Sequence, residues 1–121
     1  MRIHKLLDCP ETTAGDGARL RELVHPDRPY PFEGRYSLAH GTVPPGERTA
    51  AHVLTTDEVY HILGGKGILY VGEELALVEP GDTIEVPPAT VQWIENPGAE
   101  PLTFLCLVDP AWRPEDETII R

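Results

Sequence analysis

The residues of this chain that could do chemistry lie in two stretches, the first around His52, Glu58 and Tyr60 and the second around Gln92. An imidazole, a carboxylate, a phenol and an amide can bind a ligand, transfer protons or coordinate a metal ion. No Ser/His/Asp or Cys/His constellation and no glycine-rich phosphate loop accompanies them in the sequence. The chemistry of the chain therefore depends on whether its fold brings these four side chains together.

Strand geometry decides which of these side chains meet. Alternate residues of a strand share a face, so Glu58 and Tyr60 point to one side and His61 points to the other. The residues between them are mainly Val, Leu and Ile. An interior in which His52, Glu58, Tyr60 and Gln92 converge among apolar side chains is the usual form of a small-molecule site.

Composition limits the class of protein. The chain has 121 residues, enough for one domain, and 40% of them are hydrophobic, enough for a core. A formal net charge of −10 argues against binding nucleic acid or an anionic membrane surface. The two cysteines, Cys9 and Cys106, are too few for a disulfide framework. Because there is no signal-peptide stretch and no apolar run of membrane-spanning length, we expect a soluble, cytoplasmic protein.

Short strands joined by tight turns dominate the expected secondary structure. The chain contains 11 glycines and 13 prolines, and no apolar period of 3.6 residues runs for any useful length. Evenly spaced strands with Gly/Pro turns are typical of an antiparallel sandwich or barrel. We expect roughly ten strands, at residues 3–7, 19–25, 36–43, 52–54, 58–63, 68–71, 75–78, 83–86, 91–96 and 102–108.

Residues 46–65 and 81–96 resemble the two conserved boxes of the cupin family. The positions in register with those boxes are Gly46, His52, Glu58 and Gly65 in the first and Gly81, Pro87 and Asn96 in the second. The resemblance implies an all-β jelly-roll barrel, also called a double-stranded β-helix. We expect a single cupin domain over residues 1–121, with N-terminal strands in 1–34, the core barrel in 35–108 and a C-terminal tail in 109–121.

The departures from the family pattern concern its metal site. A typical cupin holds an ion with three imidazoles and one carboxylate, but here Leu54 and Gln92 replace two of the imidazoles, and Ala89 replaces a glycine. The resemblance then implies His52, Glu58 and Gln92 as metal ligands. It implies either a divalent ion such as Zn, Ni, Mn, Fe or Co, held weakly or at partial occupancy, or a metal-free pocket in which these side chains hydrogen-bond each other or a ligand. Weak binding is expected because the loss of a group that only orients a metal ligand already costs ~10–100-fold in affinity.

Two functional hypotheses follow. The first is a small-molecule-binding cupin with a depleted metal site. The alternative is a metal-dependent cupin enzyme, such as a sugar-phosphate isomerase, dioxygenase, decarboxylase or cyclase, in which Tyr60 or Glu58 would move protons. Fold alone does not decide between them, so whether the chain is an enzyme stays open, as does its ligand.

We also expect a homodimer. Val59, Leu63 and Trp93 are apolar on the strand faces opposite Glu58 and Gln92, where a solvated face would carry polar residues. A second subunit would cover them, and a strand within residues 20–24 could add an edge to a sheet. The sequence assigns no role to the remaining candidate histidines, which are His25, His40 and His61.

Overall fold

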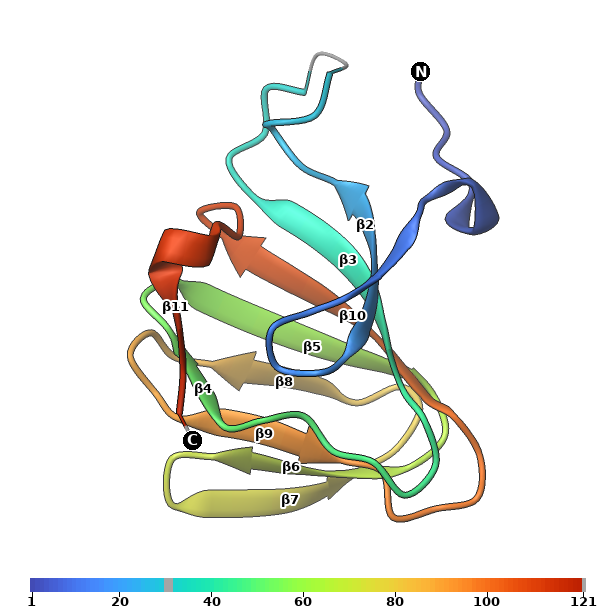
Figure 1. Ribbon diagram of the computed structural model, residues 1–121, viewed down its shortest axis with the longest axis vertical. Helices are drawn as coiled ribbons and strands as arrows, with labels where there is room; N and C mark the ends of the chain where they lie inside the picture. The colour runs from blue at the N-terminus through green and yellow to red at the C-terminus, as the bar shows by residue number, and fades with distance from the viewer. Residues whose placement is uncertain (30–31, 121) are drawn as a thin grey trace.

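Two antiparallel sheets face each other and enclose the core of the protein (Figure 1). The structure is a computed structural model that describes residues 1–29 and 32–120. Tyr30, Pro31 and Arg121 belong to the predicted terminal segments and lie outside the described residues. The all-β jelly roll expected from the sequence is confirmed.

The first sheet has six strands in the order β1-β2-β3-β10-β5-β8. Its strands are β1 (Glu11–Thr13), β2 (Arg19–Val24), β3 (Ser37–Val43), β5 (Asp57–Gly64), β8 (Thr83–Val86) and β10 (Leu102–Asp109). The N-terminal strand β2 pairs with β3 of its own chain, which accounts for one of the edge pairings considered above. The sheet therefore joins the N-terminal strands to the core barrel.

The second sheet has five strands in the order β11-β4-β9-β6-β7. Its strands are β4 (His52–Leu54), β6 (Gly67–Val71), β7 (Glu74–Val78), β9 (Gln92–Glu95) and β11 (Glu117–Ile119). The C-terminal segment, red in Figure 1, returns beside β4 and pairs with it. Residues 117–119, within the predicted C-terminal tail, are thus part of a sheet.

The strand prediction was wrong near the N-terminus. Residues 3–7 form no strand, and a 3-10 turn occupies Leu6–Asp8, so the first strand begins at Glu11. A second 3-10 turn lies at Pro114–Asp116. Among the described residues, no helix is long and apolar enough to cross a membrane.

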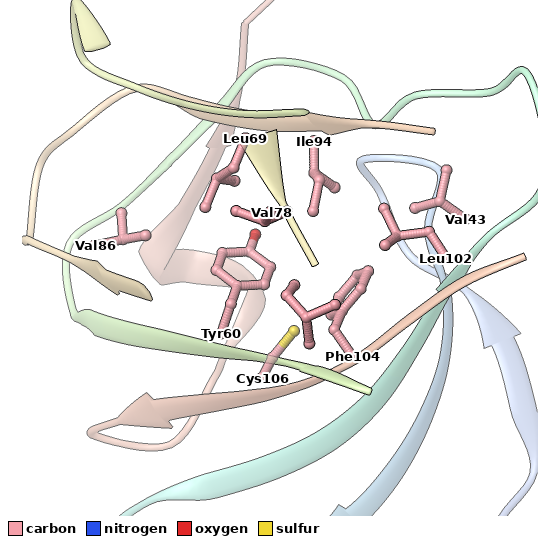
Figure 2. Close-up of a cluster of buried hydrophobic side chains, with 10 residues drawn as sticks. Val43, Tyr60, Leu69, Val78, Val86, Ile94, Leu102, Phe104 and Cys106 are labelled. Carbon is pink, nitrogen blue, oxygen red and sulfur yellow. The ribbon is translucent and has the colours of Figure 1, made fainter. Parts of the chain in front are cut away.

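The core lies where the inner faces of the two sheets meet (Figure 2). Strict alternation buries every second residue of β10, as the period of a strand requires. The buried cluster consists of Val43, Tyr60, Ile62, Leu69, Val78, Val86, Ile94, Leu102, Phe104 and Cys106. The side chains labelled in Figure 2 point toward one another from both sheets, and Tyr60 meets Phe104 edge-on at 5.3 Å.

Two backbone positions explain why the boxes need small residues. Gly65 has φ +77°, and a Cβ there would lie 2.4 Å from the carbonyl oxygen of Pro101, so only glycine fits. Ala89 has φ 60°, in the left-handed region that glycine favours. Its N–H donates to the carbonyl of Leu54 at 2.8 Å, which ties the loop between β8 and β9 to β4.

The apolar outer residues divide between the two sheets. Val59 and Leu63 lie on β5 of the six-stranded sheet, whereas Trp93 lies on β9 of the five-stranded sheet. Trp93 stacks on Tyr70 with ring centroids 4.4 Å apart. These three predicted interface residues therefore belong to two separate faces.

Candidate functional site

A cavity of about 260 Å³ lies between the sheets. Its walls come from the N-terminal hairpin, the inner faces of β3, β4, β5 and β10, and the C-terminal segment. The ionisable and aromatic lining residues are Asp16, Glu22, His52, Glu58, Tyr60, Phe104, Cys106, Trp112 and Glu117. Small and aliphatic residues, such as Ala18, Leu20, Ala39, Leu54 and Val108, complete the walls.

The four side chains singled out in the sequence lie together. His52 on β4 is paired in register with Gln92 on β9, while Glu58 and Tyr60 reach toward them from β5. The Tyr60 hydroxyl donates to Gln92 Oε1 at 2.7 Å, and Gln92 Nε2 donates to Glu58 Oε1 at 2.7 Å. All four are buried, and Gln92 is 1% exposed. A hydrogen-bonded chain from Tyr60 through Gln92 to Glu58 therefore links the two sheets.

His52 is held by its backbone and faces a carboxylate. Its Nδ1 donates to the carbonyl of Ala50 at 2.8 Å, which leaves Nε2 directed at Asp16 Oδ2, 3.6 Å away. Asp16 is in turn oriented by the N–H of Ala18, which donates to Oδ1 at 3.0 Å. Sequence reasoning missed Asp16, because an Asp-Gly pair signals a turn and only the tertiary fold brings that turn to His52.

Burial controls the ionisation of the site. It raises the pKa of Glu58 from an ordinary 4.5 to about 7, although the Gln92 hydrogen bond and the nearby His52 oppose the rise. The negative charges of Asp16 and Glu117 add to it. Burial also holds the pKa of Tyr60 and of the Cys106 thiol well above their usual ranges, so both keep their protons at neutral pH.

The C-terminal segment supplies a further part of the cavity wall. The Trp112 indole lines the cavity and its Nε1 donates to Glu117 Oε2 at 2.9 Å. The backbone N–H of Trp112 donates to Ser37 Oγ at 2.9 Å, and its carbonyl lies 2.7 Å from His25 Nε2. Because His25 Nδ1 accepts the N–H of Asp27, Nε2 carries the proton and donates to Trp112.

The other histidines lie outside the cavity. His25 is buried but acts on the backbone of Trp112. His40 on β3 is half-buried, and burial lowers its pKa. His61 Nδ1 lies 2.7 Å from Thr83 Oγ1 on the face of β5 opposite Glu58, as strand alternation predicts.

The arrangement of donors does not fit a resident metal ion. The Gln92 carbonyl oxygen points to the Tyr60 hydroxyl, and its amide nitrogen, which has no lone pair for a metal, points to Glu58. Leu54 adds an apolar wall beside His52. Within the described residues, no group of three or more His, Cys, Asp or Glu side chains could hold an ion. The ligand set of His52, Glu58 and Gln92 thus stays a prediction, and no step below is routed through a metal.

Comparison with known proteins agrees with the fold. The family model of the cupin domain matches residues 39–108. This chain belongs to the cupin family. The uncharacterized protein MJ1618 of Methanocaldococcus jannaschii is 41% identical over 108 residues, which cover 88% of this cupin and 84% of that protein.

Solved structures show the same barrel in proteins of more distant sequence. The polyketide cyclase RemF of Streptomyces resistomycificus superposes with a TM-score of 0.82 at 19% identity, over 100% of this cupin and 86% of that chain. A predicted oxalate decarboxylase of Thermotoga maritima has a TM-score of 0.79 at 18% identity, over 90% of this cupin and 99% of that chain. These likenesses concern the fold, and the chemistry has to be argued from the site.

Proposed function

We propose that this cupin binds a small molecule in the cavity between its sheets, with His52, Glu58 and Tyr60 in the polar wall and Gln92 holding Tyr60 and Glu58 from behind it. The observation that supports this most directly is the buried chain from Tyr60 through Gln92 to Glu58, two of whose members line the cavity. Such a chain orients Glu58 with one oxygen engaged by Gln92. An apolar cavity with a few oriented polar groups is the ordinary form of a ligand site.

A second candidate function is proton transfer on a bound molecule. It is favoured by Glu58, a cavity-lining carboxyl whose pKa of about 7 lets it give or take a proton near neutral pH. Tyr60 donates a hydrogen bond to Gln92, and Gln92 donates one to Glu58, so Tyr60 would position the Glu58 carboxyl through Gln92. This candidate is the enzyme hypothesis without a metal-bound step, and it needs the same cavity to bind a substrate.

Trp112 provides the test of binding. The chain has two tryptophans, and Trp93→Phe leaves Trp112 as the reporter in the cavity wall. A panel of small cationic, neutral and anionic molecules is added to this variant, and fluorescence and thermal midpoint are recorded. We expect at least one class to shift both. In the matched control, Trp112→Phe, the remaining Trp93 lies outside the cavity and its emission stays constant.

A blocked cavity completes the test. Ala39 lines the cavity, so Ala39→Leu fills part of it while the strand stays apolar. We expect this variant to fold and to lose the response. Binding in the cavity would be contradicted if no molecule of the panel shifted the fluorescence or the thermal midpoint. It would also be contradicted if the response survived Ala39→Leu and appeared equally in the emission of Trp93 in the Trp112→Phe variant.

We also propose that the chain forms a homodimer through edge strand β7 of the five-stranded sheet. Leu75 and Leu77 on edge strand β7 are 63% and 80% exposed, and they lie beside Tyr70 and Ile68 of β6. Exposed apolar strands at sheet edges invite pairing with another chain. Antiparallel pairing of two copies of β7 about Ala76 would set Leu75 of one copy opposite Leu77 of the other and extend the sheet.

Light scattering tests the dimer. We expect a dimer mass for the wild type at micromolar concentration and a monomer mass for Leu77→Lys. Leu63→Lys is the matched control, because Leu63 is 44% exposed on the other sheet. A monomeric wild type, or a dimer that Leu63→Lys disrupts and Leu77→Lys does not, would contradict this interface.

A further inference from the structure

We infer that the cavity recognises a small organic ammonium ion, a protonated amine on a short apolar body. The inference rests on the proposed function, since it names the class of molecule that the same cavity takes. It is carried by the charge of the lining, the direction of its hydrogen bonds and the position of the His52 ring nitrogen Nε2.

The charges of the lining are one-sided. Its carboxylates are Asp16, Glu22, Glu58 and Glu117, and none of the described lining residues is a lysine or an arginine. Glu22 is paired with Arg28, which lies outside the cavity lining, at 2.8 Å. Among the described residues, Glu58 and Glu117 have no basic ion-pair partner, and that of Asp16 is His52, 3.6 Å away. Because charges interact strongly where water is excluded, this lining opposes an anion and attracts a cation. Dicarboxylates and sugar phosphates are therefore poor ligands for this cavity.

Three side-chain donors of the wall are already engaged. The Tyr60 hydroxyl donates to Gln92, the Gln92 amide donates to Glu58, and the Trp112 indole donates to Glu117. What remains directed at the cavity from the charged groups is acceptor capacity, on Asp16 Oδ2 and on the Glu117 carboxylate, and on Glu58 at a pH above its pKa of about 7. An ammonium group brings three donors and no acceptor, which complements a wall of this kind.

His52 gives independent evidence for a donor in the cavity. The side chain is 3% exposed, and Nδ1 donates to Ala50. Nε2 has no hydrogen-bond partner among the described residues, and the Asp16 carboxylate lies 3.6 Å away, beyond hydrogen-bond distance. With Nδ1 as the protonated nitrogen of a neutral imidazole, Nε2 is an acceptor that faces the cavity beside the Asp16 carboxylate. A donor group placed between these two acceptors would bond both.

The rest of the cavity sets the size and character of the ligand. Its volume of about 260 Å³ is below the ~300–1,000 Å³ of drug-sized sites, so the ligand is small. Leu20, Ala39, Leu54, Phe104 and Val108 line it with hydrocarbon. The body attached to the ammonium group is therefore short and apolar.

Three probes with the same five-carbon body test the inference, namely pentylammonium, 1-pentanol and pentanoate. Their affinities are measured by calorimetry at pH 7.5 and checked by Trp112 emission in the Trp93→Phe variant. Hydrogen bonds to charged groups are the stronger kind, so we expect pentylammonium to bind at least about tenfold more tightly than the other two. Ala39→Leu should abolish its binding.

Charge-removing variants locate the effect. We expect Asp16→Asn, whose amide oxygen can still accept the N–H of Ala18, to weaken pentylammonium binding about tenfold or more. Glu117→Gln, which can still accept from Trp112, should weaken it in the same direction. Asp57→Asn removes the same charge from an exposed position outside the cavity and should leave affinity unchanged. Circular dichroism verifies that each variant is folded.

Each adverse outcome has a distinct meaning. If 1-pentanol or pentanoate shifts Trp112 emission and binds as tightly as pentylammonium, the ammonium inference is wrong while cavity binding stands. If none of the three probes binds, the inference is wrong and the binding function loses support as well. If Ni²⁺ or Mn²⁺ binds with an affinity that Asp16→Asn lowers, while pentylammonium does not bind, the acceptors serve a metal ion and the inference is overturned.

Discussion

Replacement of Glu58 by glutamine should remove a specific pH dependence of folding stability. Glu58 is buried, accepts a hydrogen bond from Gln92 and has a pKa raised to about 7. Glutamine has nearly the same shape, and its amide oxygen can still accept from Gln92. Glu58→Gln therefore removes the titration while it keeps the local packing.

The sign and size of the effect follow from the shift. A carboxyl whose folded-state pKa is raised keeps its proton in the native state after the unfolded chain has lost it. Its contribution to stability is therefore full at low pH and is lost as pH rises from 4.5 through about 7. At ~1.4 kcal/mol per pKa unit the whole loss is ~3 kcal/mol, of which ~2.5 kcal/mol falls between pH 5 and pH 8.

Urea unfolding at pH 5, 6, 7 and 8 measures this loss. We expect the free energy of unfolding of the wild type to fall by ~2.5 kcal/mol relative to Glu58→Gln, or ~1–2.5 M in urea midpoint. Glu85→Gln removes an exposed glutamate from β8 and should follow the wild type. Equal pH dependence in the wild type and Glu58→Gln would refute the argument, because it would mean that Glu58 is ionised, as in water, in the folded protein.

Three further substitutions test the site and its loops. Tyr60→Phe leaves the buried Gln92 carbonyl without its donor, so we expect urea unfolding to show a free energy of unfolding lower by ~1–3 kcal/mol. An unchanged urea midpoint would contradict the hydrogen-bonded chain. Leu54→His adds an imidazole beside His52, so titration with Ni²⁺, Co²⁺ or Zn²⁺ should show a gain in affinity of about tenfold or more. No gain in a folded variant would mean that the side chain of residue 54 does not reach a metal position. Ala89→Gly relieves a left-handed backbone conformation and should raise stability by ~0.5–1 kcal/mol in the same urea assay, whereas a loss would show that Ala89 is not strained.

The local sequence pattern was enough to predict most of the strands and to predict which side chains of β5 point inward. Period-two alternation separates Glu58 and Tyr60 from His61 whatever the rest of the fold does, because successive side chains of a strand point to opposite sides. Turn residues such as Gly65 mark the ends of strands for a similarly local reason, since only glycine tolerates the backbone conformation there. The match of residues 46–65 and 81–96 to the two cupin boxes then predicted the jelly-roll fold.

The same reasoning did not predict where the first strand begins or that the C-terminal tail pairs with a sheet. Residues 3–7 are apolar enough to suggest a strand, but a strand forms only where a neighbour offers its backbone groups, and the partner of β2 on that side is Glu11–Thr13. The tail likewise looks polar and loose, yet residues 117–119 pair with β4. Strand pairing is non-local, so sequence periodicity does not report it.

The composition of the site was readable in part from the sequence, and its electrostatics were decided by the tertiary structure. His52, Glu58, Tyr60 and Gln92 could be named from spacing, because each lies at a fixed place in a box or on a strand. Asp16 and Glu117 come from segments 36 residues before His52 and 59 residues after Glu58, and only the closing of the two sheets brings them to the cavity. Charge and burial act through space, so the pKa of Glu58 and the acceptor character of the wall exist only once the chain has folded.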